Sequence, residues 1–415
     1  MSGCADGVQP RDLAEQVARR SYGKLIAFLA ARTRDLAAAE DALSEAFAAA
    51  LAHWPRTGCP QNPEAWLMTV ARRKVLDANR SQHREVASDS LVETANAIEA
   101  AVDSEIIPDR RLGLMFACAH PAIDRAVRAP LVLQTILGLD AVRIASAFLV
   151  SPATMSQRLV RAKQKIRQAG IPLEIPQCSE LSTRLDTVLD AIYAAFAEGW
   201  IDAAGTDVAR RDLAEEAIYL GRVIVTLLPA EPEALGLLAL MLHAEARRSA
   251  RRNRDGDYIP LAQQNTALWN AQMTTEAESL LRRAGKMNAV GRYQLEAAIQ
   301  SAHAARSLSG HSDWAAIVEL YDALLAISGS PVAAVDRSLA IAELHGPQRA
   351  LEELDHVAQD PRLIEYQPYW AARADLLARI NAPEASSHTY SLAIGLERDP
   401  SVRRFLEQRQ KLVDE

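Results

Sequence analysis

Residues 139–167 read LDAVRIASAFLVSPATMSQRLVRAKQKIR, and this segment has the layout of a helix-turn-helix. Ile144 and Ala145 supply the packing face of a first helix, and a short apolar turn follows. Ser151 before Pro152 is a favourable N-cap followed by a first-turn proline, so a second helix is predicted to begin there.

The predicted second helix, Pro152 to Gln168, is amphipathic. Met155, Leu159 and Ile166 fall on one face, which is predicted to be buried. The opposite face carries polar and cationic donors that can reach base edges and phosphates in a major groove, namely Thr154, Ser156, Gln157, Arg158, Arg161 and Lys163. A solvated helix with ordinary surface charge would look similar, but the capped start and the single sign of charge favour DNA.

The charge of the chain is distributed unevenly around this segment. The formal net charge is −7, yet residues 1–175 hold 22 basic against 19 acidic residues, a net +3, and the remainder carries −10. Basic residues gather in the predicted helices 64–84 and 152–168, whereas residues 85–109 contain seven acids and no Lys or Arg. We therefore expect a solvated acidic linker between two small basic modules, with nucleic acid as the partner of those modules.

The composition predicts an all-α protein. The chain is rich in alanine, aromatic residues make up only 5%, and the apolar spacing is helical throughout. No apolar run approaches the roughly 20 residues that a membrane span needs, and the charged N-terminus does not read as a secretory signal, so the cytoplasm is the expected compartment. The four cysteines lack CxxC spacing, which argues against a disulfide framework and a zinc site.

Before the linker, three helices are predicted at residues 12–34, 37–53 and 64–84. The loop RTGCPQNP, residues 56–63, lies before the third and basic helix. Its prolines and glycine predict a fixed, non-helical excursion. Such a loop could hold an unstacked base or could simply connect two helices.

The second of these helices contains the sequence DALSEAF. Asp41 and Glu45 stand four residues apart and so share one exposed face, while Leu43 and Phe47 share another that faces inward. The acidic face could bind a basic protein partner or could only be solvated.

These elements together resemble a known family. The order of DALSEAF, WLMTVARRKVLDANR, an acidic linker and SPATMSQRLVRAKQKIR is similar to bacterial extracytoplasmic-function (ECF) sigma factors, which have regions two and four without region three. The stretch FACAHPAI, residues 116–123, is similar to the class of these factors that carries a long C-terminal tetratricopeptide-like extension, and the similarity covers nearly the whole chain. The implied domains are region two at 1–84, the linker at 85–109, region four at 110–175 and the extension at 176–415.

The resemblance implies core RNA polymerase and promoter DNA as partners. Asp41 and Glu45, supported by Leu43 and Phe47, would bind the coiled coil of the largest polymerase subunit. Minus-ten recognition and strand opening would fall to Trp66, Arg72, Arg73, Lys74 and Arg80. The minus-thirty-five element would be read by Thr154, Ser156, Gln157, Arg158, Arg161 and Lys163. Ala119 stands where this class often has a second cysteine, so no metal site is expected at Cys118 and His120.

The C-terminal part is predicted to be a series of paired helices. They are expected at residues 180–203, 211–229, 231–249, 262–284, 289–305, 312–327, 331–345, 347–358, 368–380, 383–397 and 401–413. The pairs resemble degenerate tetratricopeptide units, and their net acidity suits a protein partner or a contact with the sigma domains. The same helices could merely stabilise the chain.

A basic run precedes the loop DGDYIP in this part of the chain, comprising Arg247, Arg248, Arg251, Arg252 and Arg254. It is either a phosphate or acidic-peptide site or the solvated flank of a loop.

Three functions are consistent with the sequence. The first is a polymerase specificity subunit with a fused regulatory domain. The second is a DNA-binding regulator with a helical sensor domain, and the third is a helical scaffold that binds only proteins. No glycine-rich phosphate loop, HExxH motif or Ser/His/Asp spacing is present, so neither an enzyme nor a bound cofactor is expected.

Overall fold

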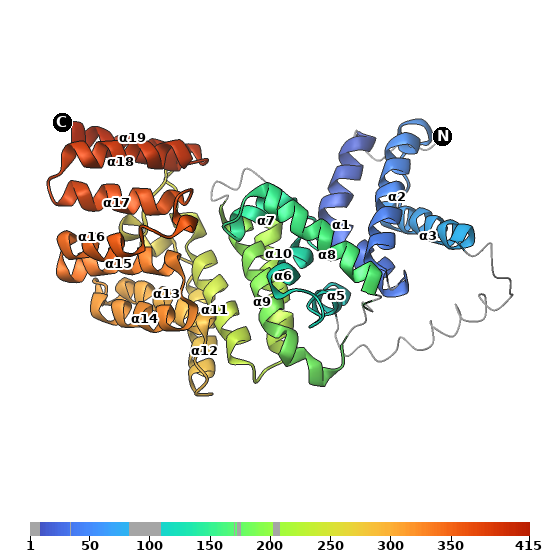
Figure 1. Ribbon diagram of the computed structural model, residues 1–415, viewed down its shortest axis with the longest axis horizontal. Coiled ribbons are helices and arrows are strands. Elements are labelled where there is room, and N and C mark those ends of the chain that lie inside the picture. Colours follow the sequence, from blue (N-terminus) through green and yellow to red (C-terminus); the bar gives the residue numbers. More distant parts are fainter. Residues whose placement is uncertain (1–8, 34, 83–108, 170, 172–175, 202–207) are drawn as a thin grey trace. The chain divides into compact units, whose positions relative to one another are not determined.

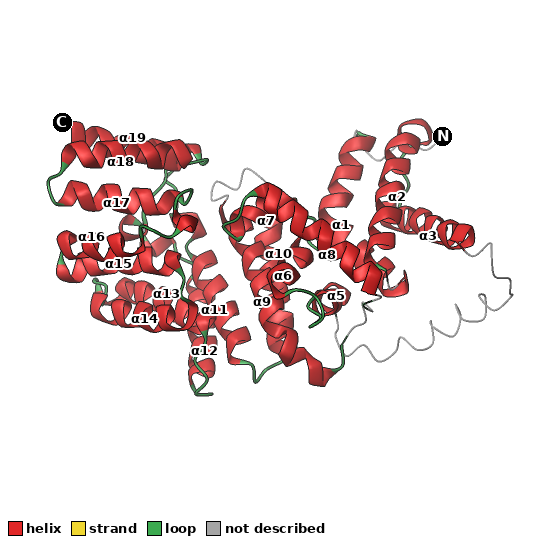
Figure 2. Cartoon of the chain, in the orientation of Figure 1, coloured by secondary structure: helices red, strands yellow, loops and turns green. Residues whose placement is uncertain are grey.

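The computed structural model describes residues 9–33, 35–82, 109–169, 171, 176–201 and 208–415. Within these ranges the chain is helical and contains no strand (Figures 1 and 2), so the predicted all-α class is confirmed. The acidic linker predicted at 85–109 lies outside the described residues, apart from Asp109. The chain divides into two compact units, residues 1–198 and 199–415.

The first unit begins with three helices, α1 (Pro10–Thr33), α2 (Leu36–Thr57) and α3 (Pro63–Gln82), which pack against one another. The predicted second helix was too short, because α2 continues through Pro55. A proline in a last turn removes one hydrogen bond, but Trp54 is fully buried in the core and holds that turn in place. Gly58 then ends the helix, with φ of 85° and its N–H bonded to the Trp54 carbonyl.

Four further helices follow after the linker, α5 (Arg110–Cys118), α6 (Arg125–Thr135), α7 (Ala141–Ala147) and α8 (Pro152–Ala169). An aspartate caps each of the first three, since the side chains of Asp109, Asp124 and Asp140 accept hydrogen bonds from backbone N–H groups of the first turn. Helix α1 packs on α5. Gly23 in α1 also allows a close approach to the end of α6, because a Cβ there would lie 2.4 Å from the carbonyl oxygen of Ile136, which caps α6.

Helix α9 (Cys178–Ile201) packs with this first unit for most of its length. Arg184 is buried and donates to the Phe116 carbonyl oxygen at 3.2 Å, which fixes α9 against α5. Nearer the end of α9, Glu198 accepts a 2.7 Å hydrogen bond from Arg143 Nε of α7. The sequence division at 175/176 assigned α9 to the C-terminal part, whereas the compact units divide at 198/199.

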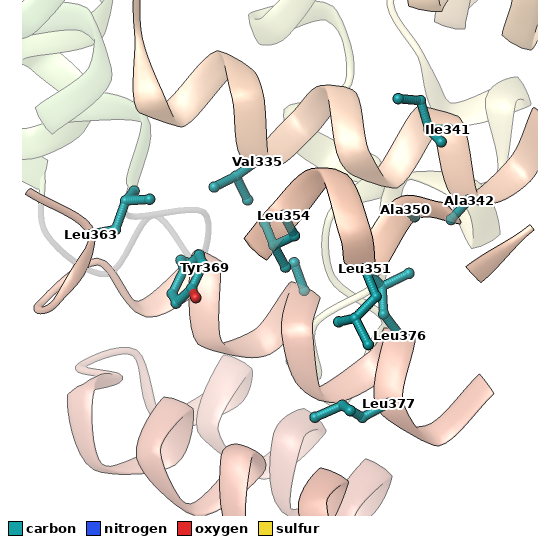
Figure 3. Close-up of a cluster of buried hydrophobic side chains, with 11 residues drawn as sticks. Val335, Ile341, Ala342, Ala350, Leu351, Leu354, Leu363, Tyr369, Leu376 and Leu377 are labelled. Atoms are coloured by element: carbon teal, nitrogen blue, oxygen red, sulfur yellow. The ribbon is translucent and has the colours of Figure 1, made fainter. Parts of the chain in front are cut away.

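The second unit is an array in which consecutive helices pack against one another. Its helices are α10 (Val208–Leu227), α11 (Pro232–Ala246), α12 (Ala271–Gly285), α13 (Arg292–Ser309), α14 (Trp314–Ser328), α15 (Pro331–His345), α16 (Pro347–Val357), α17 (Gln367–Arg379), α18 (Pro383–Leu396) and α19 (Pro400–Asp414). Several begin with proline in the first turn, where its missing N–H costs nothing. Figure 3 shows one core of the array, where Val335, Leu354 and Tyr369 bring α15, α16 and α17 together.

Residues 247–270 connect α11 to α12 without an α-helix, so the helix predicted at 262–284 begins nine residues too early. The side chain of Asn270 caps α12 and sets its start. The connecting segment reaches the last helix of the array. Arg252 is bonded to Asp399 at 2.5 Å, and Tyr258 meets Phe405 edge to face at 5.5 Å.

Gly236 of α11 is expected to be essential for the packing of α11 on α13. A Cβ at this position would lie 2.6 Å from the Gln294 backbone nitrogen, which cannot move aside as a flexible side chain can. We expect Gly236→Ala to lower the free energy of unfolding of this unit by about 1–3 kcal/mol, despite the better helix propensity of alanine. Gly395→Ala in α18, where nothing lies within 4 Å, is the control and should be neutral or stabilising in the same denaturant titration. Equal stability of the two variants would contradict the prediction.

Candidate nucleic-acid interface

Helix α8 presents the predicted DNA-contacting side chains on its solvent face. Met155, Leu159 and Ile166 are buried against the rest of the unit. Four of the six predicted contacts are exposed on the other side of the helix, namely Ser156, Gln157, Arg158 and Arg161. The helix therefore offers two guanidinium groups and two neutral polar groups to solvent along one surface.

Thr154 has a local structural role at the start of α8. Its hydroxyl lies 2.8 Å from the Ser151 hydroxyl, and its backbone N–H donates to Ser151 Oγ at 3.3 Å. These bonds satisfy donors at the helix N-terminus, as the sequence predicted for Ser151.

Lys163, predicted to contact DNA, is bonded to the second helix of the chain. Its ammonium group donates to both carboxylate oxygens of Glu40 in α2, at 2.8 and 2.9 Å, and both side chains are mostly covered. Burial, together with the charge of Glu40, raises the pKa of the nearby Tyr22 to about 12. The carboxylate of Glu40 is thus enclosed between α1, α2 and α8, and Lys163 is directed away from solvent.

The acidic face predicted on α2 is present. Asp41 and Glu45 are exposed, Leu43 is fully buried beneath them, and Phe47 is half-buried. Glu45 is bonded to Lys74 of α3 at 2.7 Å, and this hydrogen bond raises the pKa of Lys74. Asp41 is therefore the more accessible of the two carboxylates for a basic partner.

The predicted minus-ten residues lie along α3. Trp66 is half-buried and packs edge to face on Trp54, with ring centroids 5.5 Å apart. Arg72 lies 4.6 Å over the ring of Phe28, and Arg73 is exposed. The side chain of Arg80 lies outside the described residues. The helix thus has a basic outer surface, and its Trp66 packs on the buried Trp54.

A cavity of about 300 Å³ lies beside α8, and sequence reasoning missed it. Its walls come from α6, from the turn before α8, from α8 itself and from α9. Arg125 and Arg158 line it together with Asp186 and Asp190 of α9. Carboxylates of α9 therefore lie near an arginine of the predicted DNA-reading face. The sequence feature that points to this cavity is the i, i+4 spacing of Asp186 and Asp190, which places both carboxylates on one face of α9.

Two negative findings apply to the described part of the chain. No helix there is long and apolar enough to cross a membrane. No group of three or more His, Cys, Asp or Glu side chains there could hold a metal ion. Burial raises the pKa of the Cys118 thiol to about 12.

Comparison with known proteins identifies a domain in the first unit. Residues 17–85 match Sigma-70 region 2, which supports the sigma-factor prediction for α1–α3. Residues 184–285, which begin within α9, match a family of unknown function, DUF6596.

The whole chain belongs to one family with the uncharacterized protein R00370 of Rhizobium meliloti (strain 1021). The two are 35% identical over 405 residues, which is 96% of this chain and 94% of that protein. The chain is also 27% identical over 222 residues to a probable RNA polymerase sigma factor, RfaY, of Xanthomonas campestris pv. campestris, covering 49% of this chain and 51% of that protein. No solved structure matches the chain.

Proposed function

We propose that this chain is a sigma factor of the ECF type, which binds core RNA polymerase, recognises the minus-ten and minus-thirty-five elements and opens the start region. The match of residues 17–85 to Sigma-70 region 2 carries the proposal. The similarity to the probable sigma factor RfaY adds to it. The role is that of a non-catalytic subunit that acts in the cytoplasm, where polymerase and promoter DNA meet.

The geometry of α8 supports the minus-thirty-five role. A helix-turn-helix reads DNA through exposed side chains on its second helix, and α7 and α8 are joined by a short turn with Arg158 and Arg161 on the outer face. Arginine forms bidentate hydrogen bonds with guanine and also neutralises phosphates. The outer surface of α3, with Arg73 and Lys74, is the corresponding contact for the minus-ten element.

The second unit is proposed to be a tetratricopeptide-like domain that modulates this activity. Its helices stack in sequence order, as expected of a solenoid of helix pairs. The chain after residue 175 carries −10, which disfavours binding to DNA and suits a protein surface.

The proposal is tested by transcription with bacterial core RNA polymerase on a library of genomic fragments, with and without the full chain. We expect promoter-specific transcripts that depend on the chain. Asp41→Arg should reduce them at least tenfold, because it places a cation where the exposed acidic face of α2 would meet a basic partner.

The control for this experiment is Glu407→Arg, an equal charge reversal at an exposed position of α19. It should leave the transcripts unchanged. DNA binding without any core-dependent transcript, in the presence of the fused second unit and in a truncation that ends after α9, would overturn the proposal and favour a DNA-binding regulator.

A further inference from the structure

The 247–270 segment forms one wall of a recess in the second unit. The recess is lined by His243 of α11, Arg247, Leu261, Trp269, Thr274 of α12, and Gln300, His303 and Ala304 of α13. Its enclosed space is about 10 Å³, which has room for one water-sized group, and it opens to solvent through a wider mouth. The recess can therefore take one oxygen-sized group of a larger ligand.

One lining residue has a buried polar atom without a hydrogen bond. Trp269 Nε1 is shielded from solvent and has no acceptor, although an indole N–H can only donate. The neighbouring His243 side chain is 2% exposed, and its Nε2 lies 3.4 Å from a carboxylate oxygen of Glu278, a contact that lowers the pKa of Glu278. Buried donors are rarely left unsatisfied, so Trp269 Nε1 calls for an acceptor in the recess.

Cationic groups surround the same place. Arg247 donates to Gln300 at 2.6 Å, and Arg306 lies 5.6 Å over the ring of Trp269, with a buried Nε that makes no hydrogen bond. Burial, together with these two guanidinium groups, lowers the pKa of His303 to about 4. Two guanidinium groups therefore lie beside the recess, and the buried His303 imidazole next to them is held in its neutral form.

Three other arginines of the basic run make contacts outside the recess. Arg248 is paired with Glu245 at 2.7 Å, and Arg252 with Asp399. Arg251 lies 3.6 Å over the Trp200 ring and donates to the Trp200 carbonyl oxygen. Of the five arginines in the run, Arg247 is the one that lines the recess.

We propose that this recess binds the anionic head group of a small ligand, a carboxylate or a phosphate, with one oxygen in the innermost space as acceptor for Trp269 Nε1 and with Arg247 as its counter-charge. A bound anion would give Trp269 Nε1 its acceptor and would lie beside the guanidinium groups of Arg247 and Arg306. It would also join Leu261 and Trp269 of the 247–270 segment to α13, and this segment is itself bonded to α19. The site is independent of the proposed role in transcription.

The test is calorimetric titration of the full chain with inorganic phosphate and, separately, with succinate, at an ionic strength held constant with sodium chloride. We expect saturable binding of at least one anion at one site per chain. The anion that binds with the higher affinity identifies the head group. Trp269→Phe removes the N–H and keeps most of the ring, so it should weaken binding about tenfold. Arg247→Gln should weaken it further.

The matched control is Trp370→Phe in α17, where the indole N–H donates to the Ile364 carbonyl oxygen outside the recess. It should bind the anion as the unaltered chain does. A second readout is the His303 imidazole, whose pKa should rise when the anion binds and should not rise in Trp269→Phe at the same anion concentration. Absence of saturable binding in both arms, or equal affinity in Trp269→Phe and Trp370→Phe, would overturn the proposal.

Discussion

A chain carrying both Arg158→Ala and Arg161→Ala is expected to bind promoter DNA about a hundredfold more weakly than the unaltered chain. Both side chains are exposed on the outer face of α8, opposite the buried Met155, Leu159 and Ile166. Truncating them removes two cationic contacts with base edges or phosphates and leaves the packing of the helix intact. The folded state should therefore retain its stability while the affinity falls.

Fluorescence anisotropy with labelled promoter fragments, repeated at several salt concentrations, measures this loss. Each lost phosphate contact should also reduce the slope of log affinity against log salt by about 0.9. The control is the double variant Arg282→Ala, Arg283→Ala, which removes two adjacent exposed arginines from α12 in the second unit. Equal losses in the two double variants would show that the effect follows net charge and not the α8 surface.

The outer face of α8 could be predicted because its signals are local. A capping serine, a first-turn proline and an apolar spacing of three to four residues fix where the helix begins and which side is buried. The bounds of most helices in the second unit were predictable for the same reason. The helix at 331–345 was predicted to the residue, since Ser330 caps it, Pro331 begins it and Gly346 ends it.

Contacts between distant segments could not be predicted in this way. Arg252 and Asp399 are 147 residues apart, and nothing near either residue indicates the other. The residues 262–270 were likewise predicted to be part of a helix. In the structure Arg306 of α13 donates to the carbonyl oxygens of Leu261 and Gln264, and this stretch is not α-helical. The packing of α9 on α5 through Arg184 and Phe116 was hidden for the same reason.

The environment of Lys163 depends on such a contact, because its partner Glu40 lies 123 residues earlier. Because Lys163 lies on a helix rich in basic residues, the sequence predicts that it contacts DNA as its neighbours do. The structure instead places its ammonium group in a mostly buried pair with α2, one residue before the exposed Asp41. The same bond therefore covers the Lys163 ammonium group and holds α2, the helix predicted to bind polymerase, against α8.

Glu40→Gln is expected to release Lys163 and to loosen α8 from α2. The variant keeps the size of the side chain but removes the charge that compensates a mostly covered ammonium group, a loss of about 3 kcal/mol for pairs of this kind. We expect a lower free energy of unfolding for the first unit, in that range. We also expect tighter binding to DNA, with a salt slope steeper by about 0.9 because one more cation can reach a phosphate.

The control for Glu40→Gln is Glu45→Gln, which breaks the exposed pair with Lys74 and should leave the free energy of unfolding nearly unchanged. Lys163→Gln separates the two consequences of the bond. If Lys163 is withheld from DNA, Lys163→Gln lowers stability as Glu40→Gln does but leaves the salt slope at the value of the unaltered chain. A slope that falls by about 0.9 in Lys163→Gln and stays constant in Glu40→Gln would mean that Lys163 leaves Glu40 whenever DNA binds, and that the pair does not restrain the recognition helix.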